Sequence, residues 1–239
     1  MRRHMFRWSP ARIIAGAFGS ISFIGSILLY LPWGHMPGQS ITYVDALYTA
    51  VSALCVTGLS IVDTAAVFNP FGQAILVVLI QVGGLGVSTM GAGVLLMLGR
   101  KVGIRQRNLI HDTMNLDSYS GVVRFLRTLF ATTVFIEIIG AFLGYFVFRR
   151  DYEMMESIGL SIFHSISSFN NAGLTILTKE RSMEMYAEDP FMLILTTALV
   201  FVGGLGFIVI RECWVNRFRW RKLSMHSRVC LLYTSDAAD

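Results

Sequence analysis

The sequence Val82-Gly83-Gly84-Leu85-Gly86 occurs a second time as Val202-Gly203-Gly204-Leu205-Gly206, 120 positions further along the chain. The triplet Asn69-Pro70-Phe71 is matched by Asp189-Pro190-Phe191 at the same distance. Similarity at one fixed distance is the signature of repeated structural units. We therefore expect two copies of one unit, with the glycines of each copy allowing helices to pack closely.

A second set of matches precedes each of these stretches and has a shorter spacing. Ser52 and Gly58 are matched by Ser167 and Gly173, 115 positions further along. The difference of five residues fits a longer loop in the second copy, because loops tolerate changes in length at little cost. Both copies therefore have the same order of elements, and we expect them to be parallel.

Charged residues are scarce and unevenly distributed. Lys, Arg, Asp and Glu make up 15% of the 239 residues and hydrophobic residues 54%, whereas about 25% of residues are charged in soluble proteins. Long blocks carry no such charge: residues 13–44, 46–62, 64–99, 157–178 and 190–210. Because a helix needs about 20 apolar residues to cross a bilayer, the composition predicts an all-α polytopic membrane protein and excludes a disordered chain.

The apolar blocks fall into two classes by length and polarity. Four of them predict membrane-spanning helices: residues 13–31, 70–99, 122–148 and 190–210. Two others, residues 43–60 and 155–175, are too apolar for water-exposed loops and too mixed to cross the membrane. They predict re-entrant helices. Each unit then consists of a span, a re-entrant helix, an extended turn and a second span.

Lys and Arg are concentrated in three places. The first 12 residues, residues 100–127 and the tail from Arg211 hold 16 of the 20 Lys and Arg side chains, whereas residues 32–69 hold none. Positive side chains accumulate on the cytoplasmic side of a membrane. We therefore expect the N-terminus, the linker and the tail to be cytoplasmic, so that both re-entrant helices enter from the outer face.

The backbone that follows each re-entrant helix has the properties of a cation site. A helix that enters from outside directs its negative C-terminal dipole to the middle of the membrane, where it favours a cation. Non-helical backbone at that depth lines protein or a watery cavity, and its carbonyls can replace an ion's hydration shell. The expected filter carbonyls belong to Val56, Thr57, Gly58, Asn171, Ala172 and Gly173.

Three further polar residues are candidates for a role at this site. Asn170 precedes the second turn and either lines the pore or ties the filter loop to its neighbours; we favour the tie, because carbonyl selection needs a rigid frame. Asp63 follows the first turn and either concentrates cations or caps the next helix. Glu137 is the single acid inside the third span. An acid in a membrane is by default a functional candidate, and pairing with a neighbour is the alternative.

These motifs together resemble the Trk/Ktr/HKT potassium transporter superfamily. The resemblance rests on Ala53-Leu54-Cys55-Val56-Thr57-Gly58-Leu59 and Ser167-Ser168-Phe169-Asn170-Asn171-Ala172-Gly173-Leu174, on the Gly-Gly-Leu-Gly stretches, on the basic linker and on Trp220-Arg221-Lys222-Leu223-Ser224. It covers residues 10–229 and is strongest for the membrane subunit of Ktr-type bacterial uptake systems.

The resemblance implies a potassium transporter of the bacterial plasma membrane, with sodium as a candidate coupling ion and no bound cofactor. Members have four such units around one pore, pair as homodimers and dock on a cytoplasmic nucleotide-binding regulatory ring. A Gly at position 58 goes with potassium selection and a Ser with sodium permeation. Contact with membrane lipid is expected, and nucleic acid is not.

The chain has two units where the family has four, so we expect about the first half of such a protein. Residues 230–239 differ abruptly from the preceding family-like stretch and resemble a translated adapter from a sequencing library. The expected organisation is a first repeat (1–99), a basic linker (100–121), a second repeat (122–215), a basic tail (216–229) and an artefactual end (230–239).

Two other classes of protein fit parts of the sequence. A duplicated two-span cation channel has the same unit but would need a Thr-Val-Gly-Tyr-Gly type of filter, which this sequence lacks. An intramembrane hydrolase could use Ser161 as nucleophile and His164 as base, but no orienting acid or oxyanion hole accompanies them. We expect a protein that is not an enzyme, with free cysteines and no transition-metal site.

Overall fold

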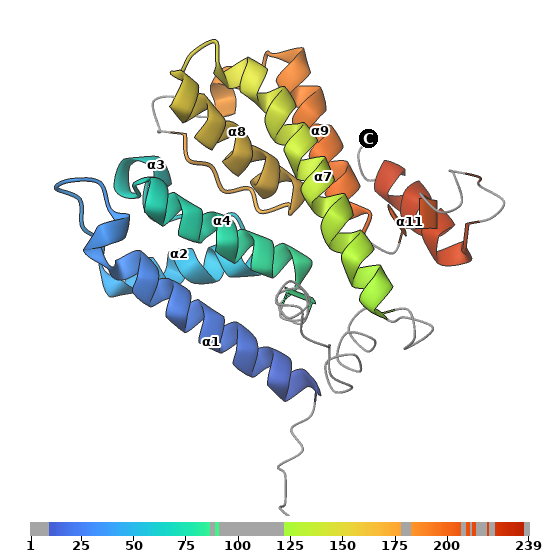
Figure 1. Cartoon of the computed structure of the whole chain (residues 1–239), viewed down its shortest axis with the longest axis horizontal. Helices are drawn as coiled ribbons and strands as arrows, with labels where there is room; N and C mark the ends of the chain where they lie inside the picture. Colours follow the sequence, from blue (N-terminus) through green and yellow to red (C-terminus); the bar gives the residue numbers. More distant parts are fainter. Residues whose placement is uncertain are drawn as a thin grey trace, which may run out of the picture.

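The computed structural model of the chain describes residues 10–86, 89–90, 122–177, 183–206, 209–210, 212–213, 219 and 223–236. These residues form helices and connecting turns, and they include no β-strand. Figure 1 shows two groups of helices side by side, one from each half of the chain. The all-α architecture agrees with the prediction.

The first group contains three main helices, α1 (Pro10–Tyr30), α2 (Tyr43–Cys55) and α4 (Pro70–Leu85). Two short elements connect them, η1 (Pro32–Gly34) and α3 (Thr64–Val67). The α2 helix packs against both α1 and α4 (Figure 1).

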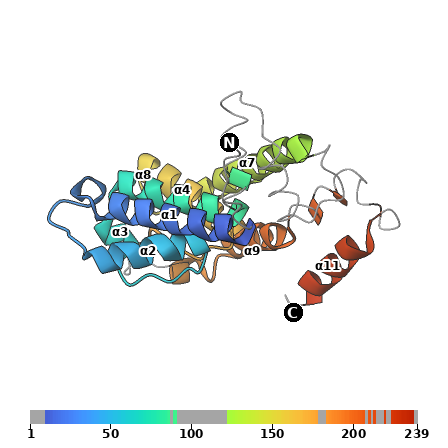
Figure 2. The same cartoon turned by 90° about the horizontal axis from the view of Figure 1, so that it is seen from below.

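The second group repeats this order with α7 (Val122–Phe148), α8 (Met154–Phe169) and α9 (Pro190–Gly204). The short helix η4 (Met183–Tyr186) precedes α9. Here α8 packs against both α7 and α9, and it also contacts α4 of the first group. Figure 2 shows α8 and α4 close to one another from a second direction.

Matching residues begin the two corresponding helices α4 and α9. Asn69 Oδ1 accepts hydrogen bonds from the backbone N–H of Phe71 (2.9 Å) and Gly72 (3.1 Å). Asp189 Oδ1 accepts from the N–H of Phe191 (2.9 Å) and Met192 (3.2 Å). Each cap satisfies two donors that a helix start leaves free, and a proline follows at the first helical position.

Two predicted spans are shorter than expected. The sequence predicted uninterrupted helices over 70–99 and 190–210, but α4 ends at Leu85 and α9 at Gly204. Gly86 and Gly206 then adopt φ values of +82° and +79°, which interrupt a right-handed helix. Helical conformation resumes at residues 89–90 and 209–210. Residues 91–99 of the predicted second span lie outside the described residues, as does the linker 100–121.

Within the described residues, two helical segments are long and apolar enough to cross a membrane, Arg12–Tyr30 and Phe125–Phe148. The apolar helices Tyr43–Cys55, Pro70–Leu85 and Pro190–Gly204 are shorter. Large apolar side chains are exposed along α1, α7 and α9, among them Ile24, Ile138, Phe142 and Ile194. Exposure of this kind is typical of helices that face lipid, so the chain is a membrane protein.

A buried apolar core joins the two groups of helices. It includes Ala53 of α2, Leu76 and Ile80 of α4, and Phe163 and Phe169 of α8. The two units are therefore held together where the ends of α2 and α8 approach α4.

The last described helix, α11 (Met225–Asp236), lies apart from both groups in Figures 1 and 2. It runs across residue 230, where the sequence predicted an artefactual end. Cys230 and Leu231 pack beside a small cluster formed by Val209, Cys213 and Leu223. The proposed boundary at residue 230 stays a prediction.

Candidate ion-pathway site

The helices α2 and α8 end in turns of the same backbone shape. Val56 and Asn171 both have φ of 57° in the left-handed region, where residues other than glycine are uncommon. Two positions later, Gly58 and Gly173 have φ of 73° and 68°. Left-handed conformations thus recur at two matching positions of the turns, 115 residues apart.

One serine in the last turn of each helix supports this shape. Ser52 Oγ donates a hydrogen bond to the carbonyl of Leu59 (2.5 Å), and Ser167 Oγ donates to the carbonyl of Leu174 (2.6 Å). The backbone N–H of Thr57 donates to Ser52 O (3.0 Å) in the first turn. These bonds hold each extended segment against the end of its own helix.

The two turns meet each other at their glycines. A Cβ atom added at Gly58 would lie 2.6 Å from the carbonyl oxygen of Ala172 and 3.4 Å from Cα of Gly173. Nearby, Thr64 Oγ1 donates a hydrogen bond to the carbonyl of Thr175. A side chain at position 58 is therefore disfavoured twice, by its positive φ and by the second turn.

Glycines on α4 and α9 bring these helices against the ends of α2 and α8. A Cβ atom at Gly83 would lie 2.0 Å from the carbonyl oxygen of Leu54, and one at Gly203 would lie 1.8 Å from that of Phe169. Both distances are far shorter than real contacts of a Cβ atom. Close helix packing is thus the structural use of both Gly-Gly-Leu-Gly stretches.

Asn170 connects three helices behind the second turn. Its Nδ2 donates to Gln81 Oε1 of α4 (3.0 Å) and to Glu137 Oε1 of α7 (3.2 Å). The side-chain hydroxyl of Ser165 donates to the backbone carbonyl of Glu137 (2.8 Å). Sequence reasoning singled out Asn170 and Glu137 but missed Gln81, whose polarity within an uncharged apolar segment was the available signal.

Asp63 lies at the beginning of α3. Its Oδ1 accepts hydrogen bonds from the N–H of Ala65 and Ala66, both at 3.1 Å. This is the capping role that the sequence allowed, and a role in attracting cations stays a prediction.

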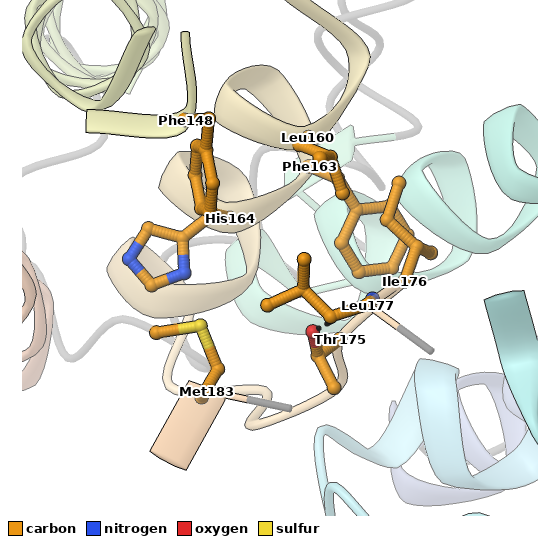
Figure 3. Close-up of a pocket in the computed structure, with 8 residues that line it drawn as sticks. All are labelled: Phe148, Leu160, Phe163, His164, Thr175, Ile176, Leu177 and Met183. Atoms are coloured by element: carbon orange, nitrogen blue, oxygen red, sulfur yellow. Dashed lines mark hydrogen bonds between the residues drawn. The ribbon is translucent and has the colours of Figure 1, made fainter. Parts of the chain in front are cut away.

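Ser161 and His164 have different hydrogen-bond partners. Ser161 Oγ donates to the carbonyl of Ile158 in its own helix (2.9 Å), while His164 Nε2 lies 3.0 Å from Thr196 Oγ1 of α9. Figure 3 shows His164 in a small cavity beside Phe148 and Met183. The contact of His164 with Thr196 joins α8 to α9, and Ser161 is bonded to its own helix rather than to His164.

Metal ligands and cysteines are the other candidate groups in the part of the chain that the structure describes. No group of three or more His, Cys, Asp or Glu side chains there is arranged to hold a metal ion. Cys55, Cys213 and Cys230 are free thiols. The distinctive arrangement is the pair of turns with their backbone carbonyls.

Comparison with known proteins decides the family. The family model described as a cation transport protein, TrkH, matches residues 10–232. The chain belongs to the TrkH family of cation transport proteins. This confirms the resemblance that the filter-like turns and the repeated glycines indicated.

Several bacterial uptake proteins are similar to this chain. It is 35% identical to Ktr system potassium uptake protein B of Bacillus subtilis over 228 residues, which are 95% of this chain and 50% of that protein. Potassium/sodium uptake protein NtpJ of Enterococcus hirae is 35% identical over 229 residues, covering 96% and 50%. Ktr system potassium uptake protein B of Vibrio alginolyticus is 35% identical over 240 residues, covering 98% and 50%. The chain thus spans about half the length of these transport proteins.

Proposed function

We propose that this chain forms half of the pore of a potassium uptake protein. Its filter carbonyls are those of residues 56–58 in the first unit and 171–173 in the second. The observation that supports this most strongly is the meeting of two turns with the same backbone shape at Gly58 and Gly173.

The chemistry of the site suits a weakly hydrated monovalent cation. The α2 and α8 helices end at the turns, so the negative ends of both helix dipoles lie beside them. Carbonyl oxygens substitute for water around potassium without binding it too tightly to leave. No cofactor is needed, and sodium is a candidate coupling ion because one relative is named a potassium/sodium uptake protein.

The proposal extends to the arrangement of units in the whole transporter. Each unit is a span, a re-entrant pore helix and a second span, and both units are parallel, with the N-terminus on the cytoplasmic side of a bacterial plasma membrane. Four units surround the pore, which fits relatives that are about twice as long as the matched region. The full transporter pairs as a homodimer and binds a cytoplasmic nucleotide-binding regulatory ring. Membrane lipid surrounds it.

A fusion protein tests the proposal. Residues 1–229 of this chain are joined to the part of the Bacillus subtilis relative that lies beyond the match, and the fusion is produced in a bacterium that lacks its own potassium uptake systems. We expect growth at low potassium and rubidium uptake, because the fusion has a complete ring of four turns.

The controls are the unmodified Bacillus relative and the 239-residue chain alone. We expect the relative to restore growth and the chain alone to fail, because two turns leave half of the ion's coordination unmet. A fusion that reaches the membrane without rubidium uptake would contradict the proposal. Uptake by the chain alone would instead favour a duplicated two-span channel.

A further inference from the structure

Three polar side chains meet in the interior where α4, α7 and α8 come together. Asn170 and Glu137 are each only 8% exposed, and Gln81 is half-buried. Asn170 Nδ2 donates to Gln81 Oε1, to Glu137 Oε1 and to the carbonyl of Ile166, at 3.0, 3.2 and 2.9 Å. Two amide hydrogens thus serve three acceptors.

This cluster lies directly behind the second turn. Asn170 is the residue before Asn171, whose left-handed conformation begins the turn. Gln81 belongs to the first unit and Glu137 to the second, so the amide of Asn170 is held by acceptors from both. A shift of the second turn relative to the first would break these bonds and leave buried polar atoms unpaired, which is costly.

Gly84 provides the space that the cluster needs. A Cβ atom there would lie 2.0 Å from Asn170 Oδ1 and 2.6 Å from Asn170 Cγ. Its copy in the second unit, Gly204, has room: a Cβ atom would meet Asn171 Nδ2 at an ordinary 3.9 Å. The two glycines are equivalent in sequence and each lies beside an asparagine side chain, but only at Gly84 would an added Cβ atom collide with it.

Among the residues that the structure describes, no matching cluster lies at the end of α2 in the first unit. The residue that corresponds to Asn170 is Cys55, which lies 115 positions earlier and is exposed. The three polar side chains are therefore specific to the contact between the first and the second unit, and the repeat alone does not explain them.

We propose that Gln81, Asn170 and Glu137 are positioning residues that set the second turn against the first and thereby adjust the preference for potassium over sodium. The inference rests on the proposed function. Carbonyls discriminate between ions by how many of them reach the ion and how freely they relax. A cluster that fixes one turn against its neighbour limits that relaxation.

The matched pair Gly84→Ala and Gly204→Ala tests this in the fusion protein. Alanine at position 84 displaces the side chain of Asn170, whereas alanine at position 204 fits. We expect Gly84→Ala to lower the ratio of rubidium to sodium uptake by about fivefold, the size of effect that loss of one buried hydrogen bond allows. Gly204→Ala should leave the ratio unchanged. Because both ions are measured on the same protein, differences in its amount cancel.

A second pair of variants tests whether Glu137 acts by holding Asn170 in position or through its charge. Glu137→Gln keeps an oxygen that accepts from Asn170, so we expect a ratio close to that of the unmodified fusion. Glu137→Leu removes the acceptor and should lower the ratio as Gly84→Ala does. Gln81→Leu removes another of the three acceptors, and because Gln81 is only half-buried we expect a smaller effect than that of Glu137→Leu. This variant also tests the positioning role if Gly84→Ala does not reach the membrane.

The reference variant Gly58→Ser separates failure of the positioning role from failure of the proposed function. If it changes the ratio while Gly84→Ala, Glu137→Leu and Gln81→Leu do not, the positioning role is wrong and the proposed function stands. If Gly58→Ser also has no effect, the proposed function fails. An equal fall of the rubidium-to-sodium ratio in Gly84→Ala and Gly204→Ala would mean that general helix packing causes the effect, and it would overturn the inference.

Discussion

At the scale of single residues, the second turn keeps its shape through a buried hydroxyl. Ser167 is 2% exposed and donates to the carbonyl of Leu174, which is also buried. Backbone polar groups in such surroundings need a partner, because water is not available to replace it. Ser52 donates to the carbonyl of Leu59 in the first turn, where Leu59 is exposed, so both turns have one supporting bond but only the second is fully buried.

Removal of that hydroxyl should therefore destabilise the protein. We expect Ser167→Ala to cost about 1–3 kcal/mol, because it leaves the Leu174 carbonyl unpaired. The measurement is the denaturation temperature of the detergent-purified fusion protein.

The control is Ser20→Ala, because Ser20 is exposed and its hydroxyl bonds to the carbonyl of Gly16 in its own helix. Equal denaturation temperatures for Ser167→Ala and Ser20→Ala would contradict this account of the turn.

Some features of single residues could be predicted from the sequence, and others could not. The non-helical turns at residues 56–58 and 171–173 followed from composition and position, and Gly58 and Gly173 within them have positive φ. The bond from Asn170 to Gln81 joins residues 89 positions apart. A single sequence does not reveal such a pair, because it arises only when α4 and α8 pack together.

At the scale of elements, glycine decides how closely helices approach. In α4, Gly83 lies against the last turn of α2, where a Cβ atom would be 2.0 Å from the carbonyl oxygen of Leu54. The positions of the helices were predictable, because the apolar blocks and the caps at Asn69 and Asp189 mark them. Their ends were not, because Gly86 and Gly206 interrupt segments that are uncharged throughout.

The packing of α4 on α2 gives a direct test. We expect Gly83→Ala to destabilise the fusion protein by about 1–3 kcal/mol, the usual cost of an overpacked contact. The fraction that remains monodisperse after heating in detergent measures this.

Gly159→Ala in α8 is the matched control, because nothing lies within 4 Å of a Cβ atom there. It should be neutral or slightly stabilising, since alanine is the better helix former. Loss of stability in Gly159→Ala equal to that in Gly83→Ala would show that the close contact is not the cause.

At the scale of the whole molecule, the distribution of Lys and Arg predicts the orientation in the membrane. The three native cysteines are replaced by serine, and single cysteines are introduced at Gly38, Met183 and Met225. We expect a membrane-impermeant thiol reagent to label positions 38 and 183 in intact cells, and position 225 only after the cells are opened. Labelling of position 183 from the cytoplasmic side alone would overturn the topology.

The central claim is that the turns of this chain form part of a potassium filter, and the ion preference of Gly58→Ser tests it most directly. The measurement is rubidium and sodium uptake by the fusion protein in cells that lack other potassium systems, with surface amounts checked and Ser161→Ala as control. A serine at position 58 adds atoms where Ala172 O already lies 2.6 Å from a Cβ position. We expect the rubidium-to-sodium ratio to fall by about tenfold, which corresponds to 1.4 kcal/mol, and Ser161→Ala to leave it unchanged. An unchanged ratio in a well-expressed Gly58→Ser protein would contradict the claim and remove residues 56–58 from the filter.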